Sequence, residues 1–148
     1  MIVVSDIEKS KMWYHDILGL NVVSDFGTNV LLTGGVSLQE KNCWKQFIGG
    51  KEVVFGNNAY ELYFEENDID NFFERLDSYS VEYVHSVVEH RWGQRVVRFY
   101  DLDKHIIEVG ENMAAVVHRF FDRRMTEEKI ASRMDVPLEY VKKMLEQS

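Results

Sequence analysis

The feature that most constrains this chain is an internal repeat of one order of secondary structure. Residues 1–40 begin with a β-branched strand, continue through a helix, and end in two or three short strands broken at Gly27 and Gly34–Gly35. Residues 58–111 follow the same order with "AYELYFEE", "NDIDNFFERLDSY", "VEYVHSVVEH", "QRVVRFYD" and "HIIEV". The repeat predicts an α+β fold built from two strand–helix–strand–strand–strand (βαβββ) modules.

Helix signals support the same division in both halves. Ser5 and Glu8 have capping-box spacing, which predicts a helix that begins at Asp6, and Gly19 is placed to end it. The segments "SDIEKS" and "NDIDNF" mark equivalent strand-to-helix joints in the two modules.

Two longer segments resemble a known family. "VSDIEKSKMWYHDILGL" and "WGQRVVRFYDLDKHIIEVGE" are similar to signatures of the glyoxalase/bleomycin-resistance/ring-cleaving dioxygenase superfamily, also called vicinal oxygen chelate (VOC) proteins. The second segment departs from the family's pattern at Leu102, where Pro is usual, and at Lys104, where Gly is usual. Asp101 and Asp103 keep the turn chemistry, and we expect Lys104 to adopt an unfavourable backbone angle. The resemblance covers residues 1–111 and implies a curved mixed β-sheet that forms a cup.

Glu108 lies among apolar, strand-forming residues, which is an unusual place for a carboxylate. Because side chains alternate between the two faces of a strand, Ile107 and Val109 share one face and Glu108 takes the other. If the two apolar residues pack under helices, Glu108 faces the cup. An unpaired buried carboxylate is costly, so we expect a donor, a metal or a ligand beside it.

The family resemblance implies a set of metal ligands, of which this sequence matches only part. Glu108 matches the family's final Glu, and Glu61 lies seven residues before Asp68, where another ligand is expected. The position of the usual first His precedes residue 1, so this ligand is either absent or lost with a shortened N-terminus. In the first module Gln39 is the better candidate and Ser37 the alternative.

These residues leave two interpretations open. In an enzyme, Glu61 and Glu108 would be the catalytic carboxylates and would hold, with Gln39, a divalent metal (Mg²⁺, Mn²⁺, Zn²⁺ or Ni²⁺), with oxygen ligands favouring Mg²⁺ or Mn²⁺. Otherwise the protein binds no metal, and the two carboxylates accept hydrogen bonds in a polar cup. The candidate donors are Arg95, Arg98 and Tyr63.

Further candidate ligand-binding residues lie in "HRWGQR". Trp92 could supply an apolar wall, Arg95 could bind an anionic group, and His90 could line the mouth of the cup. With Arg98 and Tyr63 they complete the predicted ligand-binding set. Structural alternatives are that Trp92 packs at a sheet edge and that His90 is a solvated loop residue.

Residues 112–148 form a predicted helical extension that resembles a helix–turn–helix. Thr126 is placed to cap a helix, and Asp135–Val136–Pro137 predicts a turn before the last helix. Lys142 and Lys143 are offset by nearby glutamates, and the chain carries a net charge of −8, which disfavours nucleic acid as a partner. The apolar residues of this extension lead us to expect a homodimer.

Composition narrows the remaining choices. The chain lacks an apolar run of membrane-spanning length and a secretory signal pattern, and its single cysteine suits a reducing cytoplasm. The first hypothesis is a small-molecule binding protein without a complete metal site. The alternatives are a metal-dependent glyoxalase-type lyase or isomerase or a dioxygenase, and a ligand-sensing regulator that uses its C-terminal helices.

Overall fold

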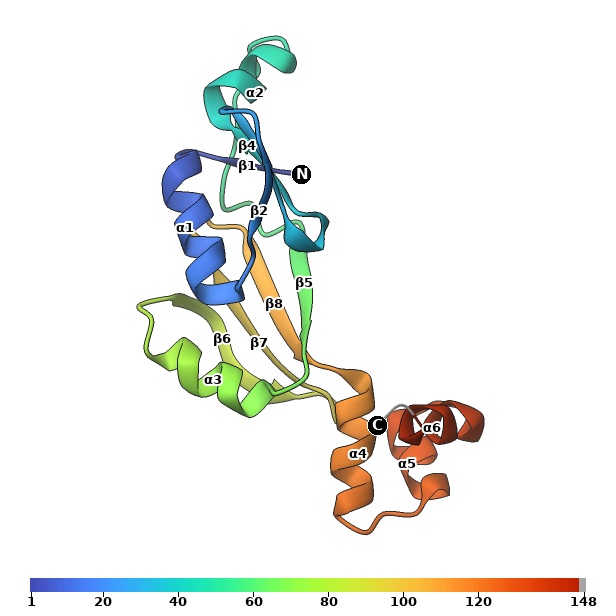
Figure 1. Ribbon diagram of the computed structural model, residues 1–148. Coiled ribbons are helices and arrows are strands. Elements are labelled where there is room, and N and C mark those ends of the chain that lie inside the picture. Colours follow the sequence, from blue (N-terminus) through green and yellow to red (C-terminus); the bar gives the residue numbers. More distant parts are fainter. Residues whose placement is uncertain (147–148) are drawn as a thin grey trace. The chain divides into compact units, whose positions relative to one another are not determined.

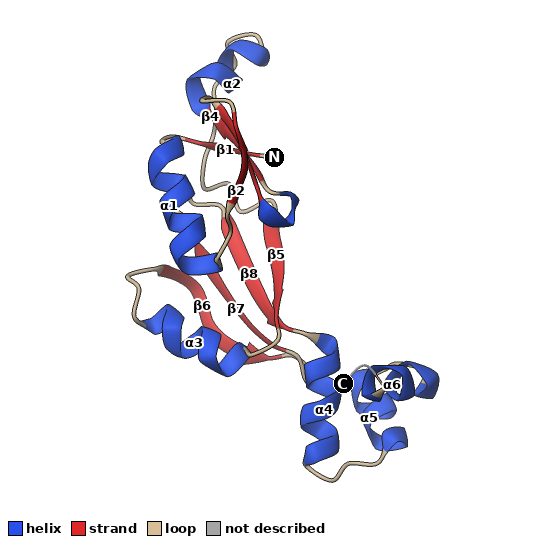
Figure 2. Ribbon diagram, in the orientation of Figure 1, coloured by secondary structure: helices blue, strands red, loops and turns tan. Residues whose placement is uncertain are grey.

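The computed structural model describes residues 1–146 of the chain and contains two compact units. The first unit comprises Met1–Tyr60 and Tyr100–His105, and the second comprises Glu61–Phe99 and Ile106–Ser148. Each unit has its own four-stranded mixed sheet and its own helices (Figures 1 and 2).

The first unit is a βαβββ module followed by a short helix. Its strand order is β1-β4-β3-β2, and β1 runs parallel to β4. The elements are β1 (Ile2–Val4), α1 (Ile7–Leu18), β2 (Val22–Asp25), β3 (Asn29–Leu32), the 3₁₀ turn η1 (Thr33–Gly35), β4 (Ser37–Glu40) and α2 (Lys41–Phe47).

The second unit repeats the topology with the order β5-β8-β7-β6, in which β5 runs parallel to β8. Its elements are β5 (Glu61–Glu66), α3 (Ile69–Asp77), β6 (Glu82–Glu89), β7 (Arg95–Tyr100), β8 (Ile106–Glu111), α4 (Met113–Asp122), α5 (Glu127–Met134) and α6 (Leu138–Leu145). The predicted α+β class, the two βαβββ modules and the C-terminal helices are therefore confirmed.

Helix α1 begins at Ile7, one residue after the predicted start, and Asp6 rather than Ser5 caps it. The carboxylate of Asp6 accepts a hydrogen bond from the backbone N–H of Lys9, whereas the backbone N–H of Ser5 donates to Asp103. The predicted Ser5–Glu8 capping box was therefore wrong. Gly19 ends the helix as predicted, with a φ of 68°. Lys104 also adopts the expected positive φ, at 65°.

The C-terminal helices bury their apolar side chains mainly among themselves. Thr126 caps α5 as predicted, and Asp135 ends it in the left-handed conformation. A shared core lies between α4, α5 and α6, and it consists of Val116, Val117, Phe120, Ile130, Ala131, Met134 and Val141. The apolar residues that suggested a dimer interface in the sequence are thus largely used within this helical cluster.

A buried carboxylate at the end of β8 connects the sheet to α4. Glu111 is 2% exposed and accepts hydrogen bonds from the guanidinium groups of Arg95 and Arg119. Arg95 also pairs with Asp70 of α3 at 2.6 Å, and Arg119 donates to the carbonyl oxygen of Gly93. Burial alone would raise the pKa of Glu111, but the hydrogen bonds from Arg119 and Arg95 outweigh it and lower the pKa.

Glu111→Gln is expected to lower the free energy of unfolding at pH 7 by about 2–4 kcal/mol, because the partly buried guanidinium groups of Arg95 and Arg119 lose the charge of the carboxylate that they share. The lowered pKa of Glu111 in the folded protein means that its contribution is complete above the ordinary Glu pKa. The contribution decreases as pH falls from there through the lowered pKa. Urea unfolding of both proteins across this range should show their difference shrinking toward acid.

The exposed Glu139, which pairs with Lys142 on α6, provides a matched control. Glu139→Gln should change the unfolding free energy by less than about 0.5 kcal/mol at any pH. A Glu111→Gln effect as small as this, or one independent of pH, would contradict the role assigned to the network.

Gly93 is needed at the β6–β7 connection for two reasons. Its φ is 92°, and a Cβ at this position would overlap the ring of Phe120. Gly93→Ala should therefore destabilise the protein by about 2–4 kcal/mol in urea unfolding, from backbone strain and overpacking together. Gly49 also has a positive φ but has open space around it, so Gly49→Ala should show only the smaller strain effect. Equal losses in the two variants would exclude the packing contribution.

Candidate functional site

One row of side chains crosses the second sheet, with one residue from each strand. In the strand order of the sheet these are Glu61 of β5, Glu108 of β8, Arg98 of β7 and His85 of β6. We call this set the carboxylate–arginine row. Arg98 Nε donates to Glu61 at 2.8 Å, Nη2 contacts the Glu108 carboxylate, and Nη1 lies 3.1 Å from His85 Nε2.

Strand alternation explains why Glu108 belongs to this row. Ile107 and Val109 are fully or almost fully buried, whereas Glu108 pairs in register with Tyr63, whose side chain shares a face of β5 with Glu61. Glu108 itself is only 5% exposed. Its carboxylate is thus a buried charge that requires a nearby cation.

Arg98 supplies that cation and neutralises one of the two carboxylates. Oε2 of Glu108 is in ionic contact with Arg98 but forms no directed hydrogen bond to any residue among 1–146. Because Arg98 carries one positive charge and the two glutamates carry two negative charges, the row keeps an excess of one negative charge when His85 is neutral.

This arrangement does not fit a divalent metal. The place between Glu61 and Glu108 that a metal ion would need is held by the Arg98 guanidinium. Gln39 lies in the first unit, where its amide accepts from Asn29 and donates to the carbonyl oxygen of Thr28. Within residues 1–146 no group of three or more His, Cys, Asp or Glu residues is arranged to hold a metal ion.

A second polar chain adjoins the row through Tyr63. Gln94 is 6% exposed and donates from Nε2 to the Tyr63 hydroxyl at 2.9 Å, while its oxygen accepts from the Trp92 indole at 3.2 Å. The His90 ring stacks on the Trp92 ring, with the two ring centroids 4.3 Å apart. Burial, followed by electrostatic repulsion from Arg98 and His85, lowers the pKa of His90, which favours its neutral ring.

The structure separates Arg95 from the other predicted ligand-binding residues. Its side chain pairs with Asp70 of α3 and with Glu111, on the face of the sheet that α3 covers. Arg98 lies three residues along β7 and therefore on the opposite face. The sequence reasoning did not include Gln94 or His85 in the site. For Gln94, the sequence offered only its position next to Arg95 in "WGQR". For His85 in "YVHSV", it offered only the alternation of side chains along a strand.

The comparison with known families decides the classification. The model of the glyoxalase-like domain matches residues 1–114. This chain belongs to that family. The resemblance to the glyoxalase/bleomycin-resistance/dioxygenase superfamily is therefore confirmed, while no curated protein sequence matches the chain significantly.

Solved structures agree with the assignment. A protein of unknown function from Agrobacterium tumefaciens str. C58 is 39% identical, with a TM-score of 0.69 over 76% of this chain and 91% of its own. A glyoxalase/bleomycin resistance protein/dioxygenase from Nocardioides is 19% identical (TM-score 0.61; 74% and 78% covered). A lactoylglutathione lyase from Agrobacterium tumefaciens is 19% identical (TM-score 0.56; 75% and 89% covered). The latter two share the fold.

Among the residues described, no helix has the length and apolar character needed to cross a membrane.

Removing the cation from the row should expose the cost of the buried carboxylate. Arg98→Met is expected to lower the free energy of unfolding by about 2–4 kcal/mol at pH 7, because Glu108 then lacks a partner. The double variant Arg98→Met/Glu108→Gln should recover part of this loss, since the remaining amide carries no charge. Urea unfolding of the two single variants and the double variant measures the coupling. Additive losses would contradict the pairing.

Proposed function

We propose that this member of the glyoxalase-like domain family binds a small molecule at the carboxylate–arginine row without a metal ion. The observation that carries the proposal is the position of Arg98, whose guanidinium contacts both Glu61 and Glu108. The guanidinium supplies the positive charge that the paired carboxylates require. Glu61 and Tyr63 remain accessible beside this charged centre, since the Glu61 side chain is 37% exposed and Tyr63 is 46% exposed.

The charges of the row favour a particular kind of ligand group. Because the carboxylates exceed the guanidinium by one charge, a cationic group or a strong hydrogen-bond donor is favoured over an anion. The Tyr63 ring offers an apolar surface for an aromatic body, and His90 and Trp92 extend this surface at the β6–β7 connection. The predicted roles of Tyr63, Trp92, His90 and Arg98 in ligand binding therefore belong to this proposal.

The alternative proposal is a metal-dependent lyase, isomerase or dioxygenase. Its support is the approach of Glu61 and Glu108 to one cationic group, with Glu108 at the position of the family's final metal ligand. For metal binding, Arg98 would have to leave the carboxylates. Elemental analysis after incubation with Mn²⁺, Mg²⁺, Zn²⁺ or Ni²⁺ and desalting distinguishes the two proposals.

Glu108→Gln provides the decisive variant because it keeps the shape but removes the charge. Under our proposal neither the parent protein nor the variant retains metal after desalting. The aromatic cation benzamidine should shift the NMR signal of the Trp92 indole N–H, and Glu108→Gln should weaken its binding about 3- to 10-fold. Benzoate, its anionic counterpart, should not bind. Stoichiometric metal in the parent that falls sharply in Glu108→Gln would establish the alternative instead.

We also propose that the protein forms a homodimer. The support now comes from exposed apolar side chains on the edge strands, namely Val22 and Val23 on β2 and Val84, Val87 and Val88 on β6. Light scattering should give the mass of two chains, and replacement of Val87 by Lys should shift the mass toward that of one. A mass of one chain for the parent protein would exclude the dimer.

A further inference from the structure

The turn between β7 and β8 contains a buried hydrogen-bond network that the proposed function does not use. The Asp101 carboxylate accepts from the Tyr14 hydroxyl at 2.7 Å and lies 2.8 Å from His105 Nδ1. It also accepts from the backbone N–H groups of Asp103 and His105. The side chains of Asp101 and His105 are only 2% and 3% exposed, and all of these residues belong to the first unit.

These contacts determine which nitrogen of His105 carries the proton. An ionised carboxylate can only accept hydrogen bonds, so Nδ1 of His105 must donate to Asp101. In a neutral imidazole the other nitrogen, Nε2, is then an acceptor. Among residues 1–146 no group donates a hydrogen bond to this nitrogen.

A cavity of about 320 Å³ lies beside the His105 ring. Its volume is at the lower end of the range of small-molecule sites. The Phe55 and Tyr60 rings contact the imidazole, each with a centroid 5.8 Å from that of His105. Most of the residues that line the cavity are aromatic or aliphatic, including Trp44, Ile48, Val53, Phe55 and Tyr60, and the polar residues Glu52, Asn57 and His105 also face it.

We propose that this cavity binds a small aromatic molecule carrying a hydroxyl group, whose O–H donates a hydrogen bond to Nε2 of His105. Aromatic and aliphatic walls suit a planar apolar body, and a neutral acceptor in those walls selects a donor at one end of it. The residues of this cavity belong to the first unit, whereas those of the carboxylate–arginine row belong to the second.

The contact with Asp101 alone does not account for a histidine at this position. Its backbone N–H and Nδ1 satisfy the carboxylate, and an asparagine side chain could supply an N–H in place of Nδ1. What histidine adds is the second ring nitrogen beside the cavity. His105→Asn therefore removes the proposed acceptor while keeping a donor for Asp101.

Phenol and anisole are matched probes, because methylation removes the hydroxyl donor and leaves the aromatic ring. Binding is followed by the ¹⁵N chemical shift of His105 Nε2. The affinity of each probe is measured by titrating it into the full-length protein. Phenol should bind and shift this signal, and anisole should bind about 3- to 10-fold more weakly, the effect of one net hydrogen bond. His105→Asn should bind phenol and anisole equally weakly.

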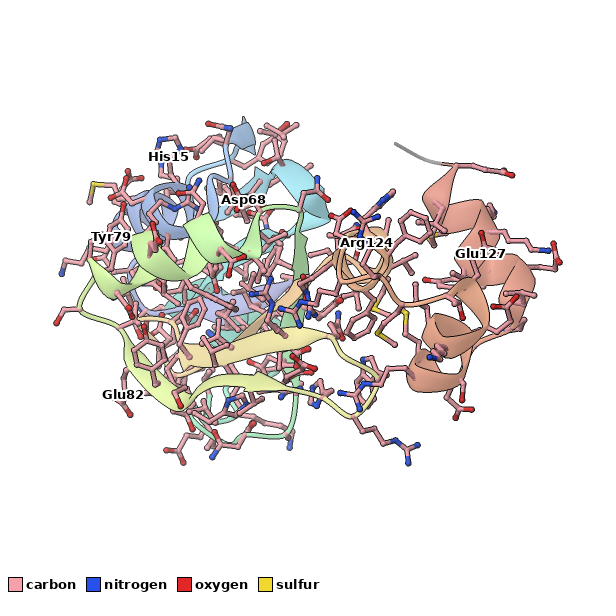
Figure 3. All side chains as sticks on the ribbon, turned by 90° about the horizontal axis from the view of Figure 1, so that it is seen from below. His15, Asp68, Tyr79, Glu82, Arg124 and Glu127 are labelled. Atoms are coloured by element: carbon pink, nitrogen blue, oxygen red, sulfur yellow. The ribbon has the colours of Figure 1, made fainter. Side chains whose placement is uncertain are left out.

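His15→Asn is the control, since His15 is an exposed histidine of the same unit (Figure 3) and should leave both affinities unchanged. Equal binding of phenol and anisole by the parent protein would overturn the proposal. It would also be overturned by no binding of either probe, or by phenol binding that His105→Asn leaves intact. If His105→Asn does not fold, as judged by its near-ultraviolet circular dichroism, the comparison of the two probes on the parent protein still decides.

Discussion

The second unit depends on the neutralisation of two carboxylates that β8 carries into buried positions. Glu108 and Glu111 are three residues apart, so they lie on opposite faces of the sheet, and each is at most 5% exposed. The neighbouring strand β7 carries Arg95 and Arg98 at the same spacing. Arg98 pairs with Glu108 on one face, and Arg95 pairs with Glu111 on the other. On both faces of the sheet, an arginine of β7 thus neutralises a buried carboxylate of the adjacent strand β8.

The two ion pairs have different surroundings. These surroundings explain why we assign the Glu111 pair a structural role and the Glu108 pair a role in ligand binding. Glu111 receives a second guanidinium from Arg119 of α4, and Arg95 is also held by Asp70, so this network joins sheet and helices. Arg98 instead holds two carboxylates, and one of them, Glu61, is partly exposed. The first network has its charges matched by contacts within the protein, whereas the second retains a negative charge that a ligand can use.

Much of this architecture could be predicted from short-range patterns. The repeated order of elements gave both modules, and strand alternation separated Glu108 from Ile107 and Val109. The same rule, applied to β7, would have separated Arg95 from Arg98, which lie three residues apart. The role of Arg119 could not be predicted, because its contact with Glu111 depends on how α4 packs against the end of β8. The cap at Asp6 was missed because Ser5 is engaged by Asp103, 98 residues away in the sequence.

The strand registers of the two modules also bear on the metal question. Helices α1 and α3 begin after the equivalent caps Asp6 and Asp68, so Val4 corresponds to Glu66. Val4 pairs with Glu40, and Glu66 pairs with Glu111, which makes Glu40 the equivalent of Glu111. Three residues before Glu40 and Glu111 lie Ser37 and Glu108, which are therefore equivalent. One residue before them lie Gln39 and Gly110, which are equivalent to each other.

The first module therefore offers a hydroxyl where the second offers a carboxylate, and that hydroxyl accepts a hydrogen bond from Asn29 at 3.2 Å. A neutral serine oxygen is a far weaker ligand for a divalent cation than a carboxylate, because it brings no charge to offset the desolvation of the ion. Arg98 and Ser37 thus depart from a metal site in complementary ways. One supplies a positive charge within the second module, and the other withholds a negative charge in the first. Replacing Arg98 alone would leave two carboxylates in the second module, fewer than the three protein ligands or so that a catalytic divalent ion takes.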